Sequence, residues 1–128
     1  MRLLLDTCTF LWVIGGSTEL SDTARELFSA SENEVYLSAV STWEISIKHS
    51  LRRLVLPDPP QRFIPLQRDQ HGIASLPLDE ESTLHLLRLP QLHNDPFDRM
   101  LVCQAIVQGL SILTPDKLIT QYPVRVLW

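Results

Sequence analysis

Four acidic residues stand where short apolar segments end or where helical patterns begin. They are Asp6, Glu44, Asp98 and Asp116. Carboxylates that lie close together repel one another, so their pKa values rise unless a cation neutralises them. Oxygen ligands of this kind select Mg²⁺ or Mn²⁺, and such a metal can activate water for attack on a phosphodiester. If the fold brings the four acids together, the sequence predicts metal-dependent phosphodiester hydrolysis.

Short apolar segments alternate with helical patterns and must supply the framework for these acids. Strands are expected at residues 2–5, 35–38, 73–76, 110–113 and 124–127. Helices are expected at residues 7–14, 21–32, 41–54, 79–89 and 96–108, and the proline-rich residues 57–65 predict a loop that leads into a short or broken helix. Strands that alternate with helices form a parallel sheet with helices on both faces. We therefore expect an α/β fold in a single domain over residues 1–128.

Two of the acids are expected side by side at one edge of this sheet. Asp6 directly follows an apolar strand, and the carboxyl ends of parallel strands are where open sheets bind their ligands. Asp116 follows a later strand in the same way. Because neighbouring strands lie only about 4.8 Å apart, Asp116 is expected next to Asp6.

Glu44 has two interpretations that the sequence leaves open. It lies one turn into a helix that follows a strand, so it can also reach the carboxyl edge of the sheet. However, Ser41-Thr-Trp-Glu44 has the form of a capping box, in which Ser41 caps the helix and the glutamate returns to the cap backbone. Taken alone, the pattern favours capping.

Asp95 and Asp98 surround the start of another helix. Asp95 before Pro96 is typical of an N-cap followed by proline at the first helical position. Asp98 is harder to explain by capping, because Leu101 and Val102 lie three and four residues further along and share its face. A carboxylate on an apolar face is costly, so we expect a cation to meet Asp98.

The composition is that of an ordinary globular protein, with 45% hydrophobic and 20% charged residues. No apolar run is long enough to cross a bilayer, and the first acid comes too early for a signal peptide, so the cytoplasm is expected. Fifteen acidic against eleven basic residues argue against coating nucleic acid by charge alone. Cys8 and Cys103 lie in apolar segments and are expected to be buried free thiols.

Few basic residues are placed to meet a phosphate near the acids. The candidates are Lys48, Arg52, Arg53 and Arg99. A solvated helix face or salt bridges to nearby acids explain Arg52 and Arg53 equally well. The four histidines show no metal-ligand spacing, and His93 deserves a test because it precedes Asn94-Asp95-Pro96.

Four stretches of the chain resemble the PIN-domain ribonucleases, most closely the VapC-type toxins of bacterial toxin–antitoxin pairs. They are LLLDTCTFLW, LSAVSTWEISIKHSLRRL, LPQLHNDPFDRMLVCQA and LTPDKLITQYPV, and together they span nearly the whole chain. The resemblance implies a PIN-like fold, a parallel β-sheet flanked by α-helices on both faces. It also implies a Mg²⁺-dependent endoribonuclease, with Mn²⁺ as an alternative metal. The resemblance gives Asp6, Glu44, Asp98 and Asp116 the catalytic and metal-binding roles, with Asp95 and Thr114 in support.

The same resemblance implies an RNA substrate, a cognate antitoxin, a homodimer and no membrane. Cys8 stands where many relatives have histidine and Cys103 where alanine is usual, but neither replaces an acid. Two alternatives stay open: an RNA-processing nuclease without an antitoxin, and a PIN module that binds RNA or protein without cleaving. A phosphatase of the haloacid dehalogenase type is set aside, because it needs a second aspartate at the position of Cys8.

Overall fold

The computed structural model describes residues 1–128, and a five-stranded parallel sheet forms its centre. Its strands are β1 (Arg2–Leu5), β2 (Glu34–Ser38), β3 (Ile73–Leu76), β4 (Ser111–Leu113) and β5 (Val126–Leu127). They lie in the order β3-β2-β1-β4-β5, and every neighbouring pair is parallel. The chain therefore places β2 and β3 on one side of β1, and later adds β4 and β5 on the other side of β1. In open parallel sheets, ligands bind at the carboxyl ends of the strands where the order reverses in this way.

Strand β1 is the central strand, and its burial explains its uniformly apolar sequence. Leu3, Leu4 and Leu5 are all fully buried. Leu3 and Leu5 belong to the hydrophobic cluster on one face of the sheet, and Leu4 belongs to the cluster on the other. A strand covered on both faces needs apolar side chains on both, so it shows no alternation of apolar and polar residues.

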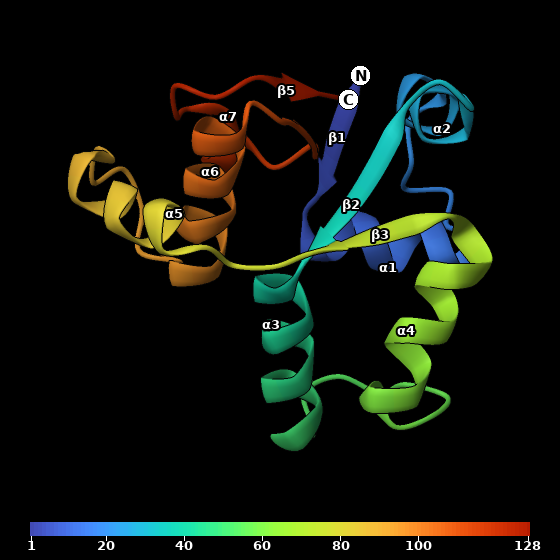
Figure 1. The fold of residues 1–128 in the computed structure, drawn as a ribbon. Helices are drawn as coiled ribbons and strands as arrows, with labels where there is room; N and C mark the ends of the chain where they lie inside the picture. Colours follow the sequence, from blue (N-terminus) through green and yellow to red (C-terminus); the bar gives the residue numbers. More distant parts are fainter.

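The helices form two layers around this sheet, as predicted. They are α1 (Thr7–Gly15), α2 (Asp22–Ser29), α3 (Ala39–Ser50), α4 (Pro60–His71), α5 (Glu80–His85), the 3-10 turn η1 (Leu86–Arg88), α6 (Pro96–Gln108) and α7 (Lys117–Thr120). Figure 1 shows α6 and α7 on one side of the sheet and α1, α2 and α4 on the other. Phe10, Ala24 and Ile64 pack in one cluster, whereas Leu101 and Ile119 pack in the other.

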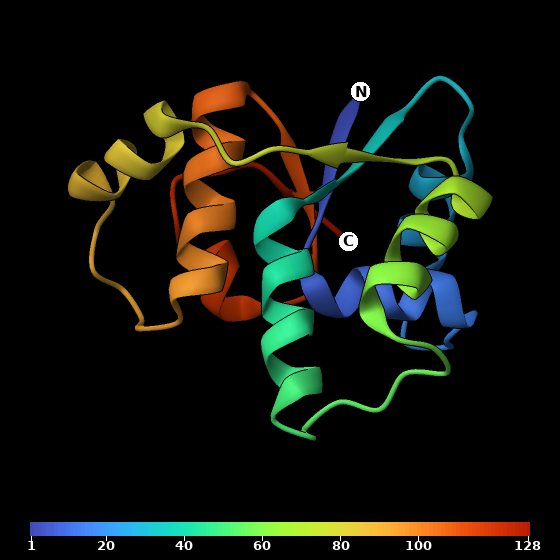
Figure 2. The ribbon, with the colours of Figure 1, turned by 60° about the horizontal axis from the view of Figure 1, so that its bottom comes forward.

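Helix α3 connects the two layers. It contacts α1 and α4 on one side and α6 on the other. Figures 1 and 2 both show it standing between α4 and α6, below the carboxyl end of β2. A residue on the first turns of α3 can therefore meet residues that follow β1 and residues at the start of α6. No helix in the structure is long and apolar enough to span a bilayer.

The short helix α7 was not predicted, and α2, α3 and α5 end earlier than expected. Two further differences have a clear local cause. Helix α3 begins at Ala39 rather than at residue 41, because Ser38 is its N-cap and its hydroxyl accepts a hydrogen bond from the Val40 N–H at 3.0 Å. Helix α4 is twelve residues long and continues through Pro65, so the expectation of a short or broken helix was wrong. Pro60 takes the first helical position, where proline loses no hydrogen bond. The single bond lost at Pro65 is offset by burial of Ile64 in the core.

One buried hydroxyl of α1 lacks a hydrogen-bond partner and gives a prediction on stability. Thr9 is fully buried, and its Oγ1 has no partner. Thr9→Val replaces the hydroxyl by a methyl group of similar shape, so the free energy of unfolding should rise by about 1 kcal/mol. Urea unfolding would measure the change, with Thr23→Val on the exposed face of α2 as the matched control. A clear loss of stability in Thr9→Val alone would show that the hydroxyl does have a partner.

Candidate active site

Asp6 joins the end of β1 to the start of α1. Its Oδ1 accepts a hydrogen bond from the Thr9 N–H at 2.9 Å, which caps α1, and its Oδ2 accepts one from the Thr114 hydroxyl at 2.6 Å. The residue is 5% exposed. Burial raises the pKa of the Asp6 carboxyl above its usual range, although the hydrogen bonds from Thr114 and Thr9 oppose the rise. The negative charge of Asp116 raises this pKa further.

Asp116 follows β4 and is brought close to Asp6 through Thr114. The buried Thr114 hydroxyl donates to Asp6 Oδ2 and accepts a hydrogen bond from the Asp116 N–H at 3.0 Å. Asp116 is also the N-cap of α7, where its Oδ1 accepts from the Leu118 N–H at 2.9 Å. The sequence prediction that these two acids lie at the carboxyl ends of adjacent strands agrees with the pairing of β1 and β4.

Glu44 is a buried residue of α3 that is directed at the end of β1 rather than at its own helix terminus. Its Oε1 accepts a hydrogen bond from the Thr7 hydroxyl at 2.7 Å, and its Oε2 pairs with the ammonium group of Lys48 one turn later. Ser41 Oγ lies 3.0 Å from Thr7 Oγ1. Thr7 has a single hydroxyl proton, and this proton is directed at the Glu44 carboxylate. The Ser41 hydroxyl is therefore the donor in its hydrogen bond with the Thr7 oxygen.

The capping-box interpretation of Ser41 and Glu44 is therefore wrong. Ser41 lies inside the first turn of α3, since the helix is capped by Ser38 three residues earlier. Glu44 makes its contacts across the molecule with Thr7 and locally with Lys48. Its hydrogen bond raises the pKa of the Lys48 ammonium group, as expected for an ion pair.

Asp98 lies in the first turn of α6 and is only partly accessible. Asp95 caps this helix, and its Oδ1 accepts hydrogen bonds from the N–H groups of Phe97 at 2.9 Å and of Asp98 at 3.0 Å. The Asp98 side chain is 19% exposed, and its Oδ2 lies 3.3 Å from Nε2 of His93. Burial is the main cause that raises the pKa of Asp98 to about 6, and the negative charge of Asp95 adds to it.

The charges of the four candidate acids influence the pKa values of side chains in one region at the carboxyl edge of the sheet. The charges of Asp116 and Asp6 both contribute to the raised pKa of Asp98. Partial desolvation raises the pKa of the Cys8 thiol, although the residue is exposed, and the charges of Asp6, Glu44 and Asp98 raise this pKa further. Asp6, Asp98 and Asp116 therefore lie within electrostatic reach of one another, and Glu44 shares with Asp6 and Asp98 an influence on the Cys8 thiol.

The donor set fits a hard divalent cation, but the side chains do not form a ready coordination site. No group of three or more histidine, cysteine, aspartate or glutamate side chains is arranged to hold a metal ion. The donors are nevertheless carboxylate oxygens, which Mg²⁺ and Mn²⁺ prefer. Of the four acids, only Glu44 is paired with a lysine. The pKa values of Asp6 and Asp98 are raised, and a nearby cation would lower them again.

Two expectations about neighbouring residues were wrong, and one buried residue was missed. Arg99 is buried, and its Nη1 donates to the carbonyl of Pro90 at 3.0 Å and to the hydroxyl of Tyr122 at 3.1 Å, so it is not available to a phosphate. Cys8 is exposed, while Cys103 is buried as expected. Tyr122 was not singled out from the sequence, because nothing in its local sequence indicates a contact with the α6 region.

Thr7 is a second residue that sequence reasoning missed. It follows Asp6 directly, so a hydroxyl next to the first acid was visible in the sequence as a possible partner. Its hydroxyl donates to Glu44. Arg52 and Arg53 lie beyond the end of α3 and are exposed, in agreement with a solvated position.

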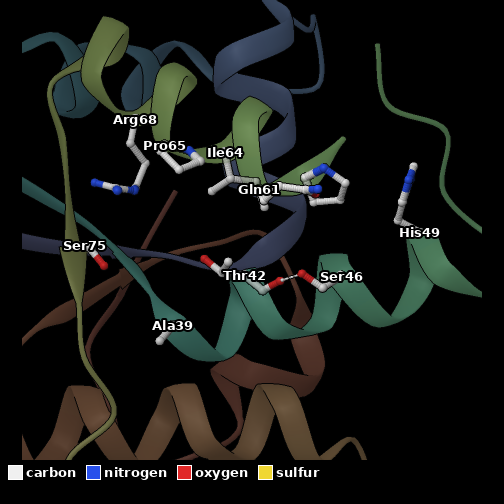
Figure 3. A pocket seen from close by; sticks show the side chains of 10 residues that line it. Ala39, Thr42, Ser46, His49, Gln61, Ile64, Pro65, Arg68 and Ser75 are labelled. Carbon is white, nitrogen blue, oxygen red and sulfur yellow. Dashed lines mark hydrogen bonds between the residues drawn. The ribbon is translucent and has the colours of Figure 1, made fainter. Parts of the chain in front are cut away.

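A cavity of about 490 Å³ lies between α3 and α4, apart from the acids. Figure 3 shows that α3, α4 and β3 contribute its lining, which includes Thr42, Arg68 and Ser75. None of the four acids lines this cavity or the two other cavities of the structure. The acidic edge is thus not part of an enclosed pocket.

Comparison with known proteins places the whole arrangement in a family. Residues 3–124 match the model of the PIN domain. Ribonuclease VapC16 of Mycobacterium tuberculosis is 33% identical over 61 residues, which cover 48% of this chain and 43% of that protein. The match thus spans less than half the length of this curated relative.

Two solved structures share the fold. That of VapBC2 from Rickettsia felis bound to a DNA fragment from their promoter has a TM-score of 0.73 at 15% identity, covering 99% of this chain and 98% of the other. That of DNA-bound VapBC from Salmonella typhimurium has a TM-score of 0.67 at 18% identity, covering 99% and 97%. Since the PIN-domain match includes all four candidate acids and all but the ends of the sequence, the chain belongs to the PIN-domain family.

Proposed function

We propose that this protein is a metal-dependent endoribonuclease and the toxin of a toxin–antitoxin pair. The observation that carries the proposal is the set of acids at the reversal point of a parallel sheet, where Asp98 has a pKa of about 6 beside other carboxylates. The similarity to a protein named Ribonuclease VapC16 supports RNA as the substrate. The likeness in fold to VapBC assemblies supports an antitoxin as the partner.

In this proposal Asp6, Glu44, Asp98 and Asp116 hold Mg²⁺, with Mn²⁺ as an alternative. The metal would supply positive charge for activating a water molecule and for stabilising charge on the phosphate. The protein's own contribution is to orient the carboxylates before the metal binds. Thr114 holds Oδ2 of Asp6, and Thr7 holds Oε1 of Glu44. The Thr9 N–H and the Lys48 ammonium group hold the second oxygens, so a cation would bind through the remaining lone pairs of these carboxylates.

Lys48 has a distinct role in the proposed enzyme. Its side chain is about half exposed, and its ammonium group pairs with Oε2 of the buried Glu44. It neutralises this carboxylate, and its half-exposed side chain could also contact an RNA phosphate at the acidic edge. Lys48 therefore replaces Arg99, which is buried and fully engaged, as the basic residue proposed to meet RNA at the site.

The proposed biological unit is a homodimer of this single domain, bound to its antitoxin in the cytoplasm. Two alternatives keep the same fold: an RNA-processing nuclease without an antitoxin, and a module that binds RNA or protein without cleaving it. The second is disfavoured because none of the four acids is replaced. A short neighbouring gene whose product co-purifies with this chain would support the toxin. Growth unharmed by its expression alone would favour the first alternative.

Cleavage of a labelled total RNA pool tests the proposed activity directly. The purified protein would be incubated with Mg²⁺, with Mn²⁺ or with EDTA, beside Asp6→Asn from the same preparation. Cleavage that requires metal and is lost in the variant would support the nuclease and identify the RNA to be sequenced. If both proteins were inert, binding without cleavage would become the better proposal. Equal cleavage by both would point to a contaminating nuclease.

A further inference from the structure

The hydroxyl of Tyr122 lies at the centre of a buried polar network beside Asp98. Tyr122 is 3% exposed and Arg99 is 7% exposed. The Tyr122 oxygen lies 3.1 Å from Nη1 of Arg99, 3.1 Å from the backbone nitrogen of His93 and 2.6 Å from Nδ1 of the same histidine. Three polar neighbours around one phenol restrict where its proton can be.

The direction of each hydrogen bond follows from which groups can only donate. A guanidinium and a backbone N–H are donors without acceptor capacity. Both donate to the Tyr122 oxygen, and this uses the two lone pairs that a phenol offers. The Tyr122 proton must therefore go to the third neighbour, Nδ1 of His93, which has to accept it. A neutral imidazole that accepts at Nδ1 carries its own proton on Nε2.

The Nε2 proton of His93 is directed at a candidate catalytic carboxylate. Nε2 lies 3.3 Å from Oδ2 of Asp98. We propose that Tyr122 and His93 are positioning residues of the active site, in which Tyr122 selects the His93 tautomer whose Nε2–H holds the Asp98 carboxylate. The inferred tautomer follows from the hydrogen-bond geometry alone. Only its effect on catalysis rests on the proposed function.

The network connects segments that carry two different acids. Tyr122 follows α7, the helix that begins after Asp116, whereas His93 precedes α6, the helix that carries Asp98. The rings of His93 and Tyr122 pack with their centroids 5.4 Å apart. Tyr122 thus fixes the loop before α6 against the segment after β4, so that Asp98 and Asp116 are held at the same edge.

Tyr122→Phe tests the inference because it keeps the buried ring and removes only the hydroxyl. Without this donor, Nδ1 of His93 has no reason to remain unprotonated, and the Nε2–H tautomer loses its preference. Long-range nitrogen–proton correlation spectra of the imidazole, recorded without metal at one fixed pH, report which ring nitrogen carries the proton. We expect the proton of wild-type His93 on Nε2, and a mixture of tautomers in the variant.

The kinetic consequence separates positioning from a general loss of structure. Loss of a residue that orients a metal ligand typically costs about 10- to 100-fold, so kcat for RNA should fall by about tenfold or more with little change in KM. The matched control is Tyr36→Phe, which removes the hydroxyl of the other tyrosine, bonded to Glu34 at the amino end of β2. This control should retain the wild-type kcat and the wild-type His93 spectrum.

Substitutions at His93 keep the inference testable if Tyr122→Phe folds poorly. Glutamine can donate an N–H to Asp98 without any choice of tautomer, whereas leucine cannot. His93→Gln should therefore retain more activity than His93→Leu, and adding Tyr122→Phe to His93→Gln should lower kcat no further. Equal losses in His93→Gln and His93→Leu would overturn the positioning role.

Failure of the inference and failure of the proposed function give different results. A proton on Nδ1 in the wild-type spectrum would overturn the inferred tautomer, whether or not the protein cleaves RNA. An active wild type with an equally active, folded Tyr122→Phe would overturn the positioning role and leave the nuclease proposal standing. A wild-type protein inert towards RNA with every metal would refute the nuclease and the catalytic role of Tyr122 together, while the spectrum would still decide the tautomer.

Discussion

Asp6→Asn is expected to lower RNA cleavage by at least about 100-fold while the protein stays folded. The asparagine oxygen can still accept the Thr9 N–H that caps α1. Its amide group can donate to the Thr114 oxygen, but the Thr114 proton then loses its acceptor, so we expect a moderate loss of stability in a protein that still folds. What the substitution removes is the negative charge at the end of β1, which the proposed cation needs.

Initial cleavage rates at saturating Mg²⁺ would measure this loss, and urea unfolding would confirm that the fold is retained. Asp58→Asn is the matched control, because Asp58 is an exposed aspartate in the loop before α4. It should cleave at the wild-type rate. A folded Asp6→Asn with wild-type activity would remove this residue from the chemistry and would redirect attention to the other acids.

Asp98→Asn is expected to make the metal-free protein more stable while abolishing its activity. The pKa of Asp98 is about 6 in the folded protein, against 3.8 for an unperturbed aspartate. At neutral pH the folded protein must therefore carry a charge that its surroundings disfavour, at a cost of about 2 to 3 kcal/mol. An asparagine carries no charge, and its oxygen can still accept the Nε2–H of His93.

The sign of this effect fixes its pH dependence. Since the folded protein binds the Asp98 proton more tightly than the unfolded chain, the contribution of Asp98 to stability is full below about pH 4 and is lost as the pH rises to about 6. The difference in stability between Asp98→Asn and wild type should therefore grow over this range and stay constant above it. Urea unfolding in EDTA at pH 4.5 and pH 7.5 would measure it.

Added Mg²⁺ provides the control for this prediction. If the cation binds beside Asp98, it should stabilise the wild-type protein at pH 7.5 and stabilise Asp98→Asn much less. The advantage of the variant would then shrink or disappear. A variant that is no more stable than wild type in EDTA at pH 7.5 would show that the Asp98 charge is well solvated in the folded state.

The parts of the fold that follow from local chemistry were predicted from the sequence. Helix α6 has the expected bounds because Asp95 and Pro96 define its start and Gly109, at a positive φ of 68°, ends it. The positions of Asp6 and Asp116 at strand ends followed from the apolar segments before them. The residues that specify each of these features lie within a few positions of it, so the features can be predicted from the local sequence.

The features that were missed depend on contacts between distant segments. The start of α3 was misplaced because Ser38 and Ser41 are both good caps, and the choice is made by β2, whose last residue Ser38 pairs with Leu76 of β3. Arg99 was a candidate to contact a phosphate, but it is buried against Pro90 and Tyr122, which come from elsewhere in the chain. The role of Glu44 likewise depends on Thr7, 37 residues away. No local pattern can report such partners.

The order of the strands has a consequence for how the protein is made. The central strand β1 is synthesised more than a hundred residues before its neighbour β4. Asp116 and Tyr122 come later still. Because such distant pairings form slowly and only once both partners are available, a chain that has not yet reached β4 lacks the site that we propose for cleavage. The cleavage that we propose must therefore wait until residues 111–122 have been made and have packed beside β1.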